Sequence, residues 1–217
     1  MMLMCGLATY AQEQKNAACS VINEQSAAFT VDTLTDEVFR RMEGRSFPEG
    51  CRVKRSDLRY LQVLHYDAEG QVKRGEMVCN KAIADDLIDI FQKLYEAHYP
   101  IERMQLIDDY GADDEQSMRA NNSSCFCYRT VEGSTKLSKH AQGLAVDINT
   151  LYNPCVRTRK DGTVLVQPAT GKKYTKRSRK FPYKITRGDL LFRLFSEHGF
   201  TWGGDWRTVK DYQHFEK

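Results

Sequence analysis

The sequence predicts an α+β fold: a single domain with a small, mostly antiparallel sheet and flanking helices. Three observations support this prediction. Residues 58–79 have the pattern of a β-hairpin, residues 80–99 that of a long amphipathic helix, and short strands and helices follow from there to the end. Strands joined by short turns pair antiparallel, and helices of this kind cover a face of such a sheet.

The hairpin and the helix after it are the clearest elements. Residues 58–66 have apolar side chains at strand-like spacing, residues 67–70 are a turn, and residues 71–79 return as the second strand. Asn80 is expected to cap the following helix, which stops before Pro100. The apolar face of this helix consists of Ile83, Leu87, Ile90, Phe91, Leu94 and Tyr95.

The remaining predicted elements are short. One helix begins at Thr35 and ends at Gly44, a second covers residues 114–120, and a last one covers residues 188–198 before Gly199. Buried strands are expected at residues 104–107, 126–131 and 144–149.

Residues 153–187 contain no predicted element. A structureless stretch of this length inside a compact domain is usually functional or disordered. It leaves directly from the strand at 144–149, so we expect it to lie beside any site built on that strand.

The N-terminal residues differ in character from the rest. Residues 1–11 form a short apolar run that ends in Ala-Thr-Tyr-Ala, similar to the core and cleavage site of a signal peptide, although the usual basic residues before it are missing. We interpret this run as a truncated signal peptide, with a plain hydrophobic tail as the alternative. An approach segment at 12–31 and the domain itself at 32–217 would follow. No run of eighteen apolar residues exists, so no transmembrane segment is predicted.

Composition and charge are those of an ordinary globular protein, with 41% hydrophobic and 28% charged residues and a net charge of +3. The charge is unevenly distributed, because residues 157–187 hold eleven Lys or Arg and one acid, Asp161. Attraction to an anionic polymer, nucleic acid or cell wall, is one interpretation. We favour a solvated basic loop, because no aromatic platform interleaves the charges, and we predict no nucleic-acid partner.

The chain has seven cysteines. Removal of the leader with Cys5 leaves six, an even number that permits disulfides in an exported protein without fixing their pairing. Cys125 and Cys127 form a C-x-C pattern, which is a weak zinc signal without a second cluster. Burial or disulfide pairing is the favoured interpretation.

Four residues have the chemistry of a catalytic zinc site. His140, Asp147 and His214 are suitable ligands, with the fourth position left to water. Gly143 allows the chain to turn between the first two, and the small Ala145 shares a strand face with Asp147. Asp211, three residues before His214, is then a spare carboxylate. Beside a zinc-bound water it would serve as the general base of a hydrolytic enzyme.

Two segments resemble motifs of one family, the zinc D,D-peptidases of the VanY and VanX type together with the L-alanyl-D-glutamate endolysins. Residues 138–147 (SKHAQGLAVD) match its pattern S-x-H-x-x-G-x-A-x-D, and Asp211 and His214 match its later carboxylate-x-x-His. Residues 199–206 (GFTWGGDW) are similar to the run that precedes the final His in many members. The resemblance covers roughly residue 58 to the C-terminus and is strongest from Asn121 onward.

The resemblance implies a hedgehog/DD-peptidase-like fold and a zinc peptidase domain. The implied enzyme is a metallopeptidase that hydrolyses peptidoglycan stem-peptide bonds, as a D-alanyl-D-alanine carboxypeptidase or a related endopeptidase. Zn²⁺ would be held by His140, Asp147 and His214, with Asp211 as the catalytic base. Export to a bacterial periplasm or cell envelope, with peptidoglycan or its stem peptides as partner and a monomeric state, is expected with this role.

The substrate residues follow less directly. Arg129 is our choice for the catalytic cation that stabilises the oxyanion, with Arg119 as the alternative. Ser138 is expected to bind substrate, as the Ser two before the first His does in the family. The family's upstream S-G-[YF]-R-[ST] run is not recognisable, and residues 121–124 stand in its place. Asn121 and Arg119 are therefore further substrate-binding candidates.

Two other functional classes remain. The first is a non-catalytic, zinc-stabilised binding module of the same fold, as in hedgehog domains. Asp211 argues against it, since a purely structural metal site needs no base. The second is nucleic-acid binding through residues 157–187, which would show steep salt dependence and no metal requirement.

Overall fold

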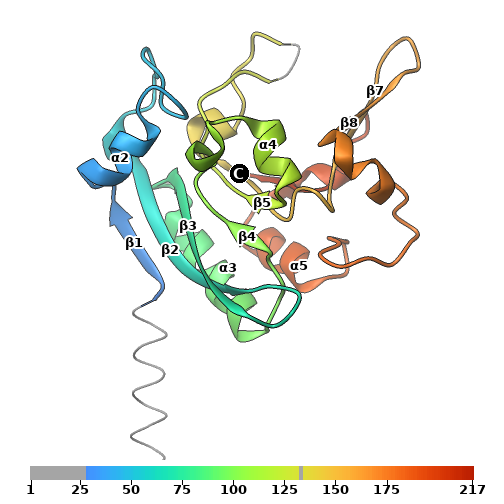
Figure 1. The fold of residues 1–217 in the computed structure, drawn as a ribbon, viewed down its shortest axis with the longest axis horizontal. Coiled ribbons are helices and arrows are strands. Elements are labelled where there is room, and N and C mark those ends of the chain that lie inside the picture. The colour runs from blue at the N-terminus through green and yellow to red at the C-terminus, as the bar shows by residue number, and fades with distance from the viewer. Residues whose placement is uncertain (1–27, 132–133) are drawn as a thin grey trace, which may run out of the picture.

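The architecture of the computed structural model is α+β, as predicted, with short antiparallel sheets and flanking helices (Figure 1). The structure describes residues 28–131 and 134–217. The predicted signal peptide at 1–11 and most of the approach segment at 12–31 lie outside these residues. No helix in the described ranges is long and apolar enough to cross a membrane.

The first sheet has the strand order β1-β2-β3 and contains the predicted hairpin. β1 spans Thr30–Thr33, β2 spans Leu58–Tyr66, and β3 spans Val72–Asn80. Gly70 has a positive φ in the connecting turn, where the Asp67 side chain accepts backbone N–H groups of Glu69 and Gln71. The predicted hairpin is therefore confirmed, with its second strand shifted by one residue to 72–80.

Helix α3 (Ala84–Glu96) covers one face of this sheet (Figure 1). The predicted apolar side chains of this helix are buried against β2, and α5 (Leu190–Glu197) packs beside it. Asn80 does not cap α3, because the helix begins four residues later. Its side chain instead accepts the N–H of Ala82 in the intervening turn.

A smaller apolar cluster lies under helix α2 (Asp36–Met42). The Thr35 side chain accepts the N–H of Val38 and caps this helix, as predicted. Helix α4 (Asp114–Arg119) also agrees with its prediction and is capped by Asp113. A short parallel pair of strands flanks this helix in the sequence, with β4 (Arg103–Met104) before it and β5 (Asn122–Ser123) after it.

The sheet that carries the site has the order β6-β11-β9 and is antiparallel. β6 spans Ala145–Asp147, β11 spans His214–Glu216, and β9 spans Thr201–Trp202. On its other side β6 contacts Ser124, whose backbone exchanges two hydrogen bonds with Asp147, at 2.9 and 3.0 Å. Asp147 is thus fixed from both edges of its strand.

The prediction of a structureless stretch at 153–187 is wrong. It contains a hairpin of β7 (Cys155–Thr158) and β8 (Val164–Gln167), and β10 (Val209–Asp211) pairs with β7 to complete a third sheet. A 3-10 helix, η4 (Ala169–Tyr174), follows. In Figure 1 the β7-β8 hairpin and the segment after it both lie on the right of the molecule.

The strand predicted at 126–131 is not formed either. The N–H groups of Phe126, Cys127 and Tyr128 donate to three different segments, at Val78, His140 and Ser46. In a regular strand, N–H groups that point to the same side, such as those of Phe126 and Tyr128, would donate to a single partner strand. The segment has an isolated bridge between Thr130 and Leu137.

Gly143 makes the turn between His140 and Asp147 possible. It ends the short 3-10 helix η3 (His140–Gln142) with φ +68°, and a Cβ placed there would lie 2.7 Å from the backbone N of Asn80. Gly143→Ala should therefore lower the free energy of unfolding by about 2 kcal/mol or more, since both the left-handed backbone and a backbone clash are involved.

Gly70→Ala is the matched control for this change. Gly70 has φ +75° but nothing within 4 Å of its Cβ position, so this substitution should cost only about 1 kcal/mol. Urea unfolding of both variants gives the comparison. Equal losses at the two positions would contradict a tight contact at Gly143.

Candidate active site

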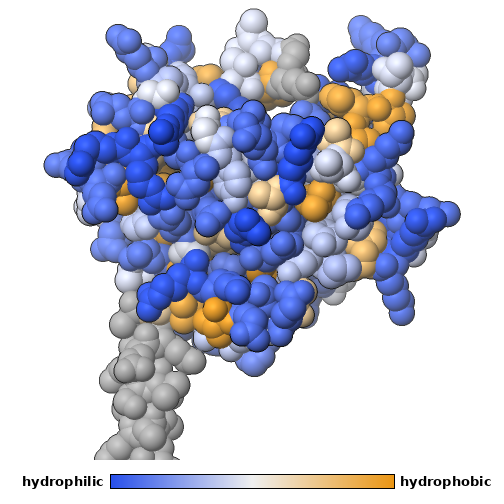
Figure 2. Space-filling view, viewed as in Figure 1, coloured by the Kyte–Doolittle hydropathy of each residue, from blue (hydrophilic) through white to orange (hydrophobic). Residues whose placement is uncertain are grey.

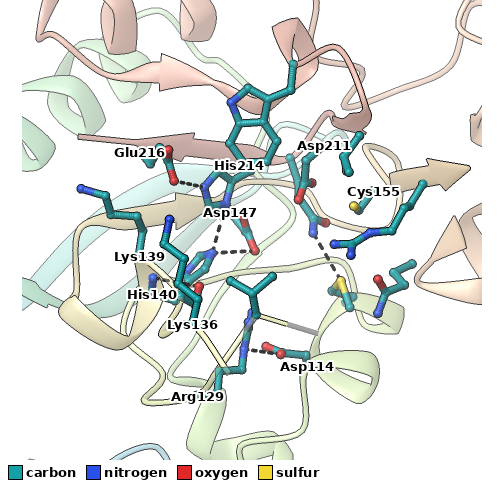
Figure 3. A pocket seen from close by; sticks show the side chains of 18 of the residues that line it. Asp114, Arg129, Lys136, Lys139, His140, Asp147, Cys155, Asp211, His214 and Glu216 are labelled. Atoms are coloured by element: carbon teal, nitrogen blue, oxygen red, sulfur yellow. Dashed lines mark hydrogen bonds and ion pairs between the residues drawn. The ribbon is translucent and has the colours of Figure 1, made fainter. Parts of the chain in front are cut away.

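Register between two strands brings the first pair of predicted ligands together. His214 on β11 is directly opposite Asp147 on β6, and its Nδ1 lies 3.1 Å from Asp147 Oδ1. His140 comes from η3, and its Nε2 lies 3.2 Å from Asp147 Oδ2. Figure 3 shows Asp147 between the two imidazoles.

The three side chains form a converging donor set. His140 Nε2 and His214 Nδ1 are 3.2 Å apart, and the ligand atoms of all three residues lie within 4.8 Å of one another. They are almost fully buried, with 4%, 8% and 6% of His140, Asp147 and His214 exposed. In the described ranges this is the one group of three or more His, Cys, Asp or Glu residues with that geometry.

Each imidazole is oriented through its other nitrogen. His140 Nδ1 is 2.7 Å from the carbonyl oxygen of Cys125, and His214 Nε2 is 3.1 Å from Glu216 Oε2. Both outward partners are acceptors, so with a metal bound these nitrogens would carry the proton and the inward nitrogens would present their lone pairs. Lone pairs facing each other at this distance suit a cation between them.

The electrostatics of the cluster favour positive charge. Burial alone disfavours a charged group, but the two imidazoles hold the pKa of Asp147 well below its usual range. Burial likewise opposes protonation of His214, yet its hydrogen bonds to Asp147 and Glu216 raise its pKa to about 10. A site that attracts a proton this strongly also attracts a metal ion, and the residue types suit zinc.

Asp211 lies in the same pocket and is not part of this donor set. It sits on β10 opposite Cys155 on β7, and its buried Oδ1 has no hydrogen-bond partner in the described part of the chain. Burial, with a further contribution from the Asp147 charge, raises the pKa of Asp211 to about 6. A carboxylate poised near neutral pH is suited to accept and return a proton.

Gly203 lets the chain approach this carboxylate closely. A Cβ at Gly203 would lie 2.6 Å from Asp211 O and 3.2 Å from His214 Cβ. The backbone at Gly203 is thus held close to the site. Trp202 is a buried core residue, whereas Trp206 lines the pocket, with its ring centroid 5.1 Å from that of His214.

The pocket has a volume of about 420 Å³. One wall is a face of the β10-β7-β8 sheet, a second consists of residues 129–131 and 136–139 with Ser138, and α4 supplies Asp114 and Met118. Arg129 lines the pocket and forms an ion pair with Asp114 (Figure 3). The structure therefore brings Ser138 and Arg129 to the site, although Arg129 does not come from the expected strand.

Asn121 and Arg119 do not line the pocket. The Asn121 amide is buried and occupied at both ends, since Nδ2 donates to Glu102 and Oδ1 accepts the N–H of Leu151. Arg119 pairs with Glu115 one helical turn away. Their hydrogen bonds hold local structure, and the structure does not place them where they could contact a substrate in the pocket.

Glu216 and Gln213 are among the pocket residues that the sequence prediction did not include. Glu216 could have been found, since it lies two residues after His214 and so shares its strand face. Gln213 is 3% exposed, and its Nε2 lies 3.4 Å from the Met118 sulfur, which can only accept. Its Oε1 has no hydrogen-bond partner in the described residues.

The five cysteines in the described ranges are free thiols. Burial raises the pKa of Cys79, Cys125, Cys127 and Cys155. The predicted C-x-C pair is buried and forms no disulfide, while Cys5 and Cys19 lie outside the described residues.

Comparison with known proteins agrees with this site. Residues 132–217 match a protein-family model described as D-alanyl-D-alanine carboxypeptidase. This match confirms the predicted relation to the zinc D,D-peptidases, over a shorter range than the motifs suggested, and it supports a peptidase. The matched range includes His140, Asp147, Asp211 and His214. No curated protein and no solved structure matches the chain.

Glu216→Gln should weaken zinc binding by about 10- to 100-fold. The neutral amide holds the His214 proton less strongly, so Nδ1 becomes a weaker metal ligand. Titration with Zn²⁺ against a competing chelator measures this change. Glu69→Gln is the control, because Glu69 is exposed and remote from the pocket. Equal zinc affinity in the two variants would remove Glu216 from the metal site.

Proposed function

We propose that this protein is a zinc metallopeptidase that hydrolyses peptidoglycan stem-peptide bonds, as a D-alanyl-D-alanine carboxypeptidase or a related endopeptidase. The observation that carries the proposal is the convergence of His140, Asp147 and His214 in one pocket. A fourth residue, the carboxylate Asp211, lies in the same pocket outside this donor set. The family match over the same residues supports the reaction class and the substrate.

The hydrogen bonds of the three residues indicate which atom of each would bind the metal. His140 would bind zinc through Nε2 and His214 through Nδ1, with Asp147 as the anionic ligand. Zinc in such a site lowers the pKa of a water molecule and polarises the scissile carbonyl. Burial of all three residues excludes bulk water and strengthens these charge interactions.

Asp211 would move the proton. It accepts a proton from the attacking water and passes it to the leaving amine as the peptide bond breaks. Arg129 lies on the opposite side of Asp147 from Asp211 in Figure 3, and its guanidinium would offset the negative charge that develops on the carbonyl oxygen. Ser138 would contact the substrate from the neighbouring wall.

The location of the protein follows from its substrate. A stem-peptide hydrolase acts in the periplasm or cell envelope, so we propose that the chain is exported and that its first residues serve as the leader. Mass spectrometry of the protein from its own host should find a mature chain that begins near Gln12.

Asp211→Asn should retain zinc and the fold but lower kcat by about 10² to 10⁴, because the base is lost while the ligands remain. Metal analysis and circular dichroism establish that the site and fold persist, and hydrolysis of a stem peptide gives the rate. Asp161→Asn, on the exposed hairpin turn, is the control. A near wild-type rate in Asp211→Asn would exclude Asp211 as the base.

The substrate assignment makes a separate prediction. Zinc-loaded protein should cleave purified muropeptides or peptides that end in D-Ala-D-Ala, and mass spectrometry of the products identifies the bond. Peptides of the same composition built from L-residues are the control. Cleavage of the L-peptides alone would refute the envelope substrate and leave the zinc chemistry standing.

A further inference from the structure

Charge is strongly segregated along this chain. Residues 157–187 carry eleven Lys or Arg and one acid, a net charge of +10. The rest of the sequence carries 21 Lys or Arg and 28 Asp or Glu, a net charge of −7. The small overall charge therefore hides two regions of opposite sign.

The structure shows that the basic region is an ordered surface. Six of its cations are exposed and form neither an ion pair with an acid nor a cation–π contact in the described residues. We call these six the basic surface: Arg159, Lys160, Lys172, Lys176, Arg179 and Lys180. In Figure 2 strongly hydrophilic residues project along the edge of the molecule that carries β7, β8 and the segment after them.

Hydrogen bonds hold the scaffold beneath the basic surface in place. The Arg177 guanidinium donates to the carbonyl oxygens of Tyr152 and Ile185, at 2.9 and 2.6 Å, and to Asn153 Oδ1. The N–H of Ala169 donates to Glu115 on α4, which ties η4 to the pocket wall. Like charges held together on a fixed scaffold repel one another, which lowers the stability of the fold unless an anion binds there.

The aromatic residues of this region correct our sequence interpretation. Tyr174 and Phe181 do lie among the charges, but their rings pack on each other and on Tyr152, with centroids 5.0 and 4.5 Å apart. They are half-buried and support the scaffold. Flat rings stacked on their neighbours in this way are poor platforms for nucleic-acid bases, which favours a partner held by charge alone.

The hairpin that carries part of the basic surface also lines the pocket. Arg157 and Gln167 of the same hairpin line the pocket wall, in the strand rows next to Asp211. A polymer whose side branch enters the pocket would therefore run across the hairpin and meet the exposed cations. The pocket itself holds only a short peptide, so most of a polymeric substrate must lie outside it.

We propose that the basic surface binds the anionic polymer from which the cleaved peptide projects, namely the carboxylate-bearing peptidoglycan strand. This inference rests on the proposed function. The cations raise the local concentration of substrate and orient the polymer with its peptide toward the zinc site. Their effect is electrostatic, so it decreases as salt is added.

The test uses the full chain with Asp211→Asn, so that the polymer stays intact during binding. Purified peptidoglycan sacculi, freed of other anionic polymers, are cosedimented with the protein over a series of NaCl concentrations. In this background the triple variant Arg159→Gln, Lys160→Gln, Arg179→Gln should bind about tenfold more weakly at low salt, and with a shallower salt dependence. On active protein, the ratio of activity on sacculi to activity on a short soluble peptide should also fall.

The matched control is Arg52→Gln, Lys54→Gln, Arg74→Gln. It removes the same charges from exposed positions outside the basic surface and the pocket, so binding should be unchanged. Equal loss in both triples, or no loss in the first, overturns the proposal. Tighter binding of duplex DNA than of sacculi at the same ionic strength assigns the surface to nucleic acid and also overturns it.

These outcomes separate the two proposals. Wild-type protein that binds sacculi through the basic surface but cleaves no stem peptide contradicts the proposed function and supports the surface. Protein that cleaves stem peptides while the first triple variant binds sacculi as well as its parent contradicts the surface alone.

Discussion

The pairing of β6 with β11 is the constraint on which the site depends. It sets His214 opposite Asp147, and the same register puts Glu216 two residues further along, where it orients the imidazole. A shift of one residue would turn all three side chains to the other face of the sheet. The buried Val146 and Phe215 between these positions face the core, so the apolar packing that stabilises the fold also fixes the ligand geometry.

The arrangement of this site depends on close packing of the backbone segments around it. Gly143 and Gly203 occupy positions where a side chain would contact neighbouring backbone. Gly143 lets the turn after η3 pack against the end of β3, and Gly203 lets its segment approach Asp211 and His214. Two of the carboxylates in the pocket, Asp147 and Asp211, then differ in role through their surroundings. Asp147 contacts both imidazoles and stays ionised, whereas Asp211 is buried without such partners and its pKa rises.

The sequence was sufficient for features set by local pattern, such as the β2-β3 hairpin and the α3 apolar face. It also singled out His140, Asp147, Asp211 and His214, which the structure brings into one pocket, because their types and order carry the chemistry. It was insufficient where distant segments compete for hydrogen bonds, as for residues 126–131. The β7-β8 hairpin was missed although Asp161-Gly162 between two apolar runs is a hairpin signal, because the surrounding charges resembled a loop. Asn121 was a substrate-binding candidate that does not line the pocket. From the sequence, a buried amide that hydrogen-bonds two segments cannot be distinguished from one that contacts a ligand.

The long separation of the ligands in the chain has a consequence for folding. His214 is 67 residues from Asp147 and 74 from His140, yet their side chains touch. Closing loops of this length is entropically costly, and contacts so distant in sequence form slowly compared with α3 or the first hairpin. A nascent chain would therefore hold two ligands well before the third arrives, and two ligands bind zinc weakly. Hydrolytic competence should appear in a single late step, when β11 docks, and not build up as the chain grows.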